Sequence, residues 1–436
     1  MTNEQSTIDN NQLPKGCKHT EVGVIPEDWE VKRLKQISPS QSVGLVINPS
    51  SYFDNEGSVP MLVGSQISEN HINWELANRI SSVSNELLPA SRLTAGDLVT
   101  VRVGNPGVTA VVPPELDGCN CASMMIVRQY SSFSSLWLCY VMNSRIGRSQ
   151  VEHVQYGTAQ KQFNISDAID FTYPVPPLPE QRSIAQALSD VDALITALDK
   201  AIAKKRAIKT ATMQQLLTGK KRLPGFGEGK GDRQTEIGVI PEDWNLRNIG
   251  DIGSVSSGGT PSRTNPKYWN GSIPWVTTTQ IDFNIINNAE QFITTDGLKY
   301  SAAKLFPPGT LLMAMYGQGK TRGKVAILDV EASTNQACAA ITFGRDVCQS
   351  YVFHYLIFQY EAIRNLSNTG NQENLNGLII KSIQILLANV EEQQAIATVL
   401  SDMDAEIAAL ETRLAKTQSI KQGMMQELLT GRTRLV

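Results

Sequence analysis

The sequence has no apolar run of the roughly 18 residues that a membrane-spanning helix requires. Residues 1–11 are polar and do not resemble a signal peptide. With 41% hydrophobic and 19% charged residues, the 436-residue chain has the composition of a soluble globular protein, and its length favours more than one domain. We therefore expect a cytoplasmic protein that makes no membrane contact.

Cysteine and histidine are too few and too scattered to predict a metal site. Only Cys119 and Cys121 lie close together, and a zinc site would need a second pair of ligands at suitable spacing. The other cysteines and the histidines are dispersed: Cys17, Cys139, Cys338, Cys348, His19, His71, His153 and His354. We expect buried or inert thiols and no bound metal.

Positive charge is not in excess either. The chain has 39 lysines and arginines against 42 aspartates and glutamates, a net charge of −3, whereas free-standing nucleic-acid binders usually carry an obvious positive excess. If the chain binds nucleic acid, the phosphate contacts must come from a locally basic surface or from a basic partner subunit.

Catalytic motifs for DNA chemistry are absent. Adenine methylation would need Asn/Asp-Pro-Pro-Tyr/Phe, but the three relevant proline pairs follow Val112, Val175 and Phe306. Residues 314–321 fit a relaxed nucleotide-binding pattern, yet a phosphate-binding loop needs a helix directly after its Lys-Thr, and here an Arg-Gly pair leads into a strand-like stretch. Two Glu-x-Lys tripeptides lack the acidic partner that a nuclease would need. We predict a chain without catalytic activity of its own.

What the sequence does contain is one frame of motifs used twice. Residues 20–29 return as residues 235–244 with a single change, from Val22 to Ile237. Two further motifs recur in the same order, Pro-Glu-Gln or Glu-Glu-Gln at 179–181 and 391–393, and Leu-Leu-Thr-Gly at 216–219 and 428–431. Most of the sequence between these motifs does not match. Constant motifs around divergent interiors indicate two similar domains that bind different targets.

A helical period follows each Glu-Gln motif. Apolar residues recur every three or four positions as Ile184, Leu188, Val191, Ile195, Leu198 and Ile202, and again as Ile396, Leu400, Met403, Ile407, Leu410 and Leu414. These two seams predict one long helix per copy. Because two matched seams are best buried against each other, we expect a helix–helix interface. The alternative is that each helix lies on its own domain.

These features divide the chain into six segments. They are an N-terminal tail (1–19), a first mixed domain (20–178), a long helix (179–218), a basic glycine-rich linker (219–234), a second mixed domain (235–390), and a second long helix with the C-terminus (391–436). Within the mixed domains, strands are expected at 97–103 and 108–112 and at 310–315 and 325–328, and short helices near 136–150 and 351–367.

The whole arrangement resembles the specificity subunit of type I restriction–modification systems, the HsdS family. The motifs that carry the resemblance are Gly-Val-Ile-Pro-Glu-Asp-Trp at the start of each half, the Gln-containing segments 157–161 and 370–372, the proline-rich approach to 179–181, the long helix, and the closing Leu-Leu-Thr-Gly. The second half departs from this pattern, because Val-Glu-Glu-Gln stands at 390–393 where the proline-rich approach is expected.

The resemblance implies an α+β protein with two tandem mixed α/β target-recognition domains. The two long helices between them would pack as an antiparallel coiled coil and give the chain pseudo-two-fold symmetry. Each domain would bind one half of a split site on double-stranded DNA. Two methyltransferase subunits and two motor-nuclease subunits would be the partners, and S-adenosylmethionine and ATP with magnesium would bind to those partners and not to this chain.

Candidate DNA contacts follow from residue chemistry, since Arg and Lys read guanine, Asn and Gln read adenine, and phosphates accept from any basic or polar donor. The candidates are Gln66, Arg102, Asn105, Gln160 and Lys161 in the first domain, and Arg263, Lys267, Gln280, Gln318, Lys320, Arg322, Lys324 and Gln372 in the second. The densest cluster is the basic loop 317–324. Gln160 and Gln372 occupy matching positions, so a structural or phosphate-binding role is open for both; Trp29 and Trp244 look like core residues. The rival function is a two-domain adaptor that binds no DNA.

Overall fold

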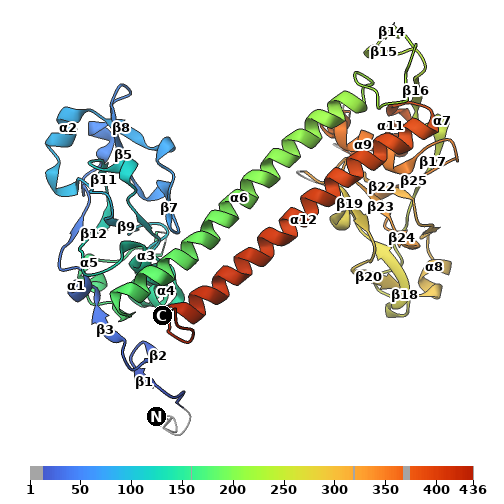
Figure 1. Ribbon diagram of the computed structural model, residues 1–436. Coiled ribbons are helices and arrows are strands. Elements are labelled where there is room, and N and C mark those ends of the chain that lie inside the picture. The colour runs from blue at the N-terminus through green and yellow to red at the C-terminus, as the bar shows by residue number, and fades with distance from the viewer. Residues whose placement is uncertain (1–12, 159, 318–319, 367–373, 436) are drawn as a thin grey trace. The chain divides into compact units, whose positions relative to one another are not determined.

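The chain folds as two compact units in a computed structural model that describes residues 13–158, 160–317, 320–366 and 374–435 (Figure 1). Unit 1 comprises residues 1–198 and 413–436, and unit 2 comprises residues 199–412. Each unit contains one mixed α/β domain with part of α6 (Leu178–Leu216) and part of α12 (Val390–Leu428). The predicted α+β class and the two long helices are confirmed.

The mixed domain of unit 1 is built on a four-stranded antiparallel sheet. Its order is β10 (Thr109–Val111), β9 (Leu98–Val101), β12 (Met124–Val127) and β4 (Gln41–Val43). A smaller sheet contains β11 (Asn120–Cys121), β5 (Val59–Leu62) and β8 (Asn78–Ile80). The other elements are β1 (Cys17–Thr20), β2 (Gly23–Pro26), β3 (Glu30–Arg33), α1 (Leu34–Ile37), β6 (Ile67–Ser68), β7 (His71–Ile72), α2 (Ser82–Glu86), α3 (Ser135–Asn143), α4 (Arg145–Val154), α5 (Ile165–Ala168) and β13 (Thr172–Val175).

The mixed domain of unit 2 repeats this plan with longer strands. Its five-stranded sheet has the order β17 (Gly253–Ser257), β25 (Cys338–Phe343), β22 (Leu311–Ala314), β23 (Val325–Leu328) and β19 (Asn284–Ile286), and a second sheet the order β20 (Gln291–Ile293), β18 (Trp269–Val276), β24 (Ala332–Thr334) and β21 (Leu305–Phe306). The other elements are β14 (Asp232–Thr235), β15 (Gly238–Pro241), β16 (Asn245–Asn248), α7 (Ile249–Ile252), α8 (Thr295–Lys299), α9 (Gln349–Phe358), α10 (Tyr360–Asn365), α11 (Gly377–Ser382) and β26 (Gln384–Leu387).

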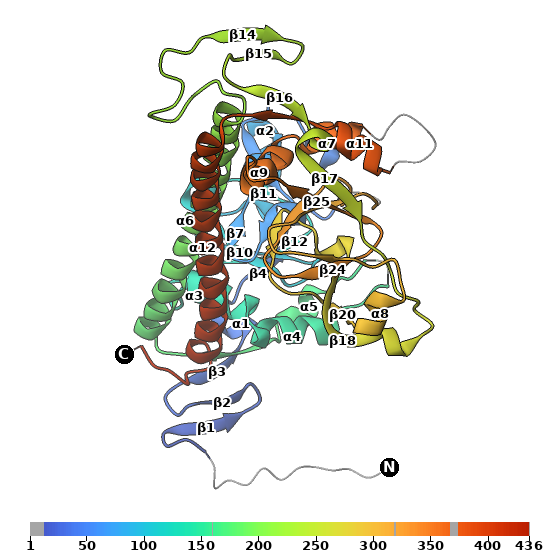
Figure 2. The same cartoon turned by 90° about the vertical axis from the view of Figure 1, so that its right-hand side faces the viewer.

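The strand pairs predicted across a turn are present in both domains. β10 pairs antiparallel with β9, and β23 pairs antiparallel with β22. The hairpin of β14 and β15 (Figure 2) begins at Asp232, inside the predicted linker, and the hairpin of β1 and β2 begins at Cys17, inside the predicted tail. The repeated motif therefore forms the turn and the second strand of the hairpin that precedes each mixed domain.

Each mixed domain is inserted through a pair of neighbouring strands. In unit 1, β3 pairs antiparallel with β13, and Glu30 lies opposite Val175. In unit 2, β16 pairs in the same way with β26, and Asn245 lies opposite Leu387. Because the entry and the exit of each domain are adjacent, the interior can change without moving the frame that holds it.

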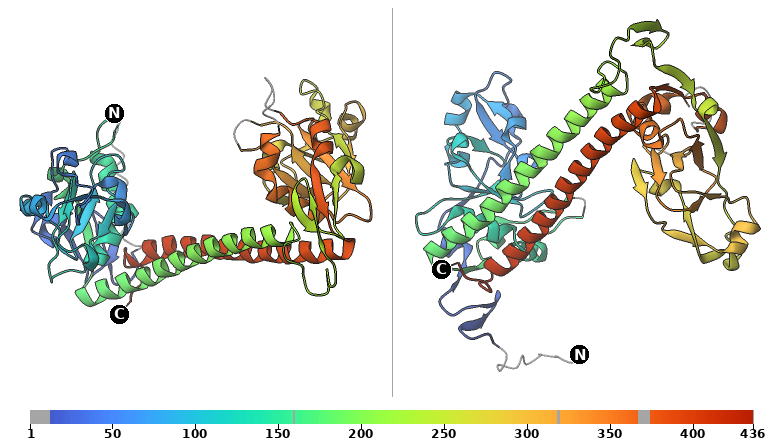
Figure 3. Two further views of the ribbon diagram at one scale, coloured as in Figure 1. Left: turned by 90° about the horizontal axis from the view of Figure 1, so that it is seen from above. Right: turned by 45° about the vertical axis from the view of Figure 1, so that its right-hand side comes forward.

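The two long helices run antiparallel within unit 2. Lys205 of α6 forms an ion pair with Glu406 of α12 at 2.5 Å, and Lys209 forms one with Asp404, so the residue number rises along one helix as it falls along the other (Figure 3). The Lys205–Glu406 pair is exposed on both sides and stabilises the packing by less than about 1 kcal/mol. No helix in the described part of the chain is long and apolar enough to cross a membrane.

The predicted helix seams divide into two groups. Ile184 and Leu188 lie in the core of unit 1, and Ile396 and Leu400 lie in the core of unit 2, each beside apolar residues of its own mixed domain. Of the remaining seam residues, Leu198, Ile202 and Ile407 are buried and Val191, Ile195, Met403, Leu410 and Leu414 are half-buried. The first turns of each helix therefore anchor it to its own domain, so for Ile184, Leu188, Ile396 and Leu400 the alternative, a helix that lies on its own domain, describes the packing better than a helix–helix interface.

In each unit, an arginine that follows a Leu-Leu-Thr-Gly motif forms hydrogen bonds with two carboxylates of the other repeat. In unit 2, Arg222 donates to Glu392 at 2.6 Å and to Asp243 at 2.9 and 3.0 Å, and Trp244 Nε1 donates to the same Glu392 at 3.1 Å. The hydrogen bonds from Arg222 hold the pKa of Asp243 below its ordinary value. Gly219, with φ +71°, packs against Pro241 so closely that a Cβ would lie 2.5 Å from Pro241 Cγ.

Unit 1 repeats this arrangement with matching residues. Arg434 donates to Glu180 at 2.6 and 2.8 Å and to Asp28 at 2.8 and 2.9 Å, and Trp29 Nε1 donates to Glu180 at 3.0 Å. We call these two clusters the arginine clasps. In each, the end of one repeat is bound to the beginning of the other, and both tryptophans are fully buried as predicted.

Four of the six cysteines, Cys119, Cys121, Cys139 and Cys338, are buried. Burial raises the pKa of Cys119 and of Cys338 to about 12, so both thiols stay protonated at neutral pH and are poor metal ligands. Among the described residues, no group of three or more His, Cys, Asp and Glu side chains is placed to hold a metal ion.

One position in the helix packing differs between the units in a way that depends on pH. In unit 1, Tyr140 of α3 donates to Asp192 at 2.8 Å. In unit 2, His354 of α9 lies at the corresponding place, with Nε2 3.1 Å from Ser401 Oγ and Nδ1 3.9 Å from Asp404. Burial, with a smaller contribution from nearby Lys209 and against the opposing effect of Asp404, lowers the pKa of His354 to about 4.

We expect His354 to make unit 2 less stable in mild acid. In the unfolded chain His354 binds a proton as pH falls through about 6.5, whereas in the folded chain it does so only near pH 4. The contribution of neutral His354 to the free energy of unfolding is therefore fully present above pH 6.5. It is lost between pH 6.5 and 4, by roughly 3 kcal/mol in all. Urea unfolding between pH 7.5 and 4.5 should show a shallower decline for H354Q than for the wild type. An equal decline would contradict this, and H19Q, at an exposed site, is the control.

Candidate nucleic-acid interface

Four predicted residues of the first domain gather at the turn between β9 and β10. Residues 102–107 form this turn, and the segment 160–163 runs beside it, because Gly104 N donates to Lys161 O at 2.9 Å and Phe163 N donates to Arg102 O at 3.3 Å. Asn105, Gln160 and Lys161 are exposed, and Arg102 is half-buried. We call residues 102–107 and 160–162 the first-domain surface.

Hydrogen bonds from α4 hold the turn in this surface in place. Arg148 donates from Nη1 to Pro106 O at 2.8 Å and from Nη2 to Asn105 Oδ1 at 3.1 Å. Gly107 has φ +90°, and a Cβ there would lie 2.9 Å from Val151 Cγ2, so only glycine fits this close approach. The turn is therefore held in one conformation without any ligand.

A polar hollow of about 540 Å³ lies between the turn and α4, with Asn105, Arg148, Glu152, Gln155 and Lys161 in its lining. Arg148, Glu152 and Gln155 were not predicted from the sequence. Their spacing of four and three residues places them on one face of α4, next to a glycine-containing turn, and this was the available signal.

Gln66 and Gln280 occupy matching 3₁₀ turns, Gly64–Gln66 and Thr278–Gln280. Gln66 Oε1 accepts from Val63 N at 2.9 Å. The Gln280 amide forms longer hydrogen bonds of 3.4 Å with Asn288 O and Glu290 N. Side chains that close their own loop in both domains are better explained as structural than as readers of two different sequences.

The corresponding turn in unit 2 joins β22 to β23, and Gln318 in it lies outside the described residues, as does Gln372. Lys320 is exposed and its carbonyl accepts from the Tyr360 hydroxyl. Lys324 forms an ion pair with Asp282 and lies 5.7 Å over the ring of Phe283. Arg322 is only 7% exposed, so its guanidinium could contact DNA only if the turn rearranged, which argues against its predicted role.

The last two candidates lie in a different loop of unit 2. Arg263 is exposed, and its guanidinium stacks 3.8 Å from the ring centre of Trp269 and 5.0 Å from that of Trp275. Lys267 is exposed in the 3₁₀ turn Pro266–Tyr268. Stacking fixes Arg263 with its N–H groups at the surface, as a DNA contact requires.

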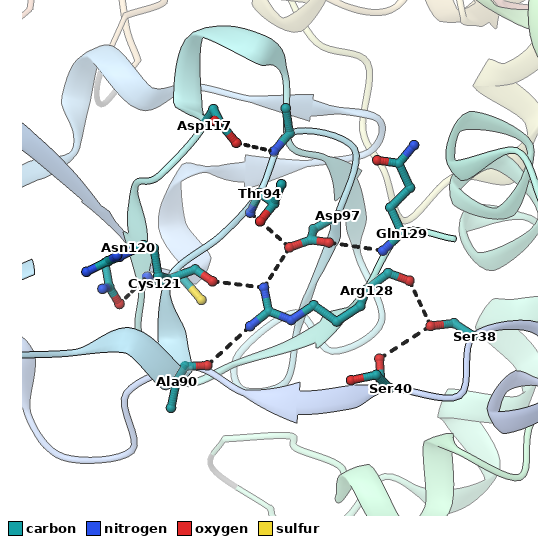
Figure 4. Close-up of polar contacts among 12 residues, drawn as sticks. Ser38, Ser40, Ala90, Thr94, Asp97, Asp117, Asn120, Cys121, Arg128 and Gln129 are labelled. Atoms are coloured by element: carbon teal, nitrogen blue, oxygen red, sulfur yellow. Dashed lines mark hydrogen bonds and ion pairs between the residues drawn. The ribbon is translucent and has the colours of Figure 1, made fainter. Parts of the chain in front are cut away.

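Not every arginine of the sheets is available for such contacts. Arg128, at the end of β12, pairs with the buried Asp97 at 2.7 Å and donates to Ala90 O at 3.2 Å (Figure 4). Asp97 also accepts from the backbone N–H groups of Thr94 and Gln129 at 2.9 and 3.0 Å. This network fastens the 90–97 loop to the sheet, so Arg128 has a structural role.

Comparison with known proteins identifies the family. The family described as type I restriction modification DNA specificity domain matches the chain twice, over residues 26–208 and 241–422. A putative type I restriction enzyme MjaX specificity subunit of Methanocaldococcus jannaschii is 26% identical over 429 residues, which cover 96% of each chain. The MjaIX specificity subunit of the same organism is 34% identical over 177 residues, 39% of this chain and 40% of that protein.

Solved structures show the same fold. The crystal structure of the type I restriction–modification S subunit from M. genitalium aligns with a TM-score of 0.60 at 12% identity, over 92% of this chain and 96% of that chain. A chain from a structure on complex assembly and conformational transition of the type I system aligns with a TM-score of 0.53 at 17% identity, over 94% and 99%. With two family matches that span most of its length, the chain belongs to the type I restriction–modification specificity subunits.

Proposed function

We propose that this subunit determines which DNA sequence a type I complex recognises, with one mixed domain reading each half of a gapped, bipartite site. The observation that carries the proposal is the duplicated frame: both units use the same hairpin, clasp and long helix, while the interiors differ. Two different readers on one kind of frame fit a site with two different halves.

The frame itself would bind the partners. A groove of about 800 Å³ in unit 1 is lined in part by residues of the repeated motifs and of the end of α12, among them Glu21, Val22, Met425, Gln426 and Thr430, and in part by residues of the mixed domain. Surfaces common to both repeats suit two copies of one partner, and two methyltransferase subunits fit this requirement. Those subunits would bind S-adenosylmethionine, and two motor-nuclease subunits would bind ATP with magnesium, so this chain would contribute no catalytic group.

The test is a methylome. The chain is co-expressed with the methyltransferase encoded beside it, and methyladenine is mapped across the host genome by single-molecule sequencing. A gapped, two-part motif that appears only when this chain is present is the expected result. A soluble complex with no new motif would contradict the proposal and favour the adaptor that binds no DNA.

Exchanging residues 30–175 for the matching segment of another specificity subunit should change one half of the motif and leave the other half intact. The reason is structural, since Glu30 and Val175 face each other on paired strands and the clasp residues lie outside the exchanged segment. The methylome of the hybrid is the measurement. A change in both halves of the motif, or in neither, would contradict the assignment of one half-site to each domain. A second hybrid, exchanged at 245–387, is the matched control and should change only the other half.

A further inference from the structure

We propose that the hollow of the first-domain surface reads a single C·G base pair, with Glu152 accepting a hydrogen bond from the cytosine N4 amino group. Gln155 and Lys161 complete the reading set. This inference rests on the proposed function and deepens it, because it assigns one position of one half-site to named side chains.

The hydrogen bonds that fix the walls of the hollow are present without any ligand. Arg148 uses both terminal nitrogens to hold Pro106 O and Asn105 Oδ1. Gly104 N is bound to Lys161 O, which fixes the opposite wall. Arg148 is therefore a positioning residue, and a bound base would meet a rigid site instead of having to order one, which lowers the cost of binding.

The side chains that face into this site have unused hydrogen-bonding groups. Within the described residues, Glu152, Gln155 and Lys161 form no side-chain hydrogen bond or ion pair with one another or with any neighbour. Together they present an acceptor, an amide that both accepts and donates, and a donor. Exposed groups at the rim of a fixed hollow are suited to a ligand that brings complementary groups of its own.

A base edge fits this set better than a phosphate does. Phosphates accept hydrogen bonds and carry negative charge; Arg148 and Lys161 would attract one, but the Glu152 carboxylate would then face a second anion and receive no donor. In the major groove, cytosine presents its N4 amino donor, and the guanine paired with it presents the O6 and N7 acceptors. Glu152 can take the first and Lys161 the second, which satisfies both charged groups on one base pair.

The spacing on α4 is consistent with groove reading. Glu152 and Gln155 are three residues apart and so project from one face of the helix, near its C-terminal end. Gln155, the residue after the last helical turn, carries an amide that can donate to the guanine or accept from the cytosine of the same base pair. The first domain would thus enter the groove with the turn and the end of α4 together.

The experiment compares the wild-type chain with E152Q, each purified as a complex with its methyltransferase. The methylome of each complex is mapped, and binding to a duplex panel is measured in which every base pair of the wild-type motif is replaced in turn. Glutamine keeps the size of the side chain and can donate as well as accept, so discrimination against the wrong pair should fall about tenfold at one C·G position of one half-site. The control is E115Q, which changes an exposed glutamate in the 3₁₀ turn Pro114–Leu116 of the same domain.

The outcomes separate this inference from the function on which it rests. A motif that becomes degenerate at one C·G pair, with the other half unchanged, supports the proposal. An unchanged motif and unchanged panel would overturn it while leaving the proposed function intact. A uniform loss of binding over the whole panel would also overturn it, because Glu152 would then affect folding or phosphate contact. No gapped motif with the wild-type chain would remove the proposed function itself.

Discussion

A chain cut after Gly225 is expected to form a stable homodimer. Such a half keeps the first domain, α6 and the closing Leu-Leu-Thr-Gly, but it lacks Leu428 and Leu429, which complete the core around Trp29 in unit 1. The equivalent leucines, Leu216 and Leu217, are present in the half. A second copy can supply them, and its Arg222 can take the place of Arg434. Light scattering after size-exclusion chromatography should give twice the mass of the half chain.

The clasp provides the control for this prediction. In the half chain, R222E would place a carboxylate beside Asp28 and Glu180, the two acceptors of Arg434 in the full chain, and should weaken dimer formation by about 100-fold. K220E changes the charge equally at an exposed residue two positions away and should leave the dimer intact. A monomeric half chain, or equal loss of the dimer in both variants, would show that the clasp does not join the repeats.

The expected homodimer follows from how the repeats are joined. Neither repeat closes its own unit: each ends in a motif whose apolar residues and arginine belong to the unit that the other repeat opens. Residues 20–29 and 235–244, which carry the clasp acceptors Asp28 and Asp243, are alike in the two repeats, whereas the domains between them differ.

The sequence predicted the elements well where a local pattern specifies them. The helical seams, the strand pairs across glycine-containing turns and the buried tryptophans each follow from spacing and residue type. The clasps were not predicted, since Arg222 and Glu392 are far apart in the chain and neither belongs to a periodic pattern. The shared position of Arg222 and Arg434, three residues after each closing glycine, was the signal that could have found them.

The candidate DNA contacts were harder to predict for a related reason. Residue type suggested Arg322, but its burial depends on how the β22–β23 turn folds, which composition does not specify. Residue type also gave no reason to select Glu152, because an acidic side chain is not expected at a DNA surface; only the hollow that it shares with Lys161 makes it a candidate. Side-chain exposure and partner geometry, which are tertiary properties, decide both cases.

R222A is expected to destabilise unit 2 by about 3 kcal/mol, the loss typical when one partner of a buried ion pair is removed. The Glu392 carboxylate is fully buried and accepts two hydrogen bonds from Arg222 at 2.6 Å; without them, its one remaining hydrogen bond within the described residues would be the one from Trp244 Nε1. Urea unfolding of the full chain is the measurement. R206A, which breaks the exposed pair with Glu411, should cost less than about 1 kcal/mol and serves as the control.

A double-mutant cycle then separates the charge from the packing. If the cost of R222A arises from a buried, unpaired carboxylate, E392Q should be much less harmful in the R222A background than in the wild type, because the neutral amide needs no compensating cation. The cycle should give a coupling of about 2 kcal/mol. Additive effects of the two substitutions, or an R222A loss no larger than that of R206A, would mean that apolar packing around Trp244, and not the clasp, holds the repeat ends together.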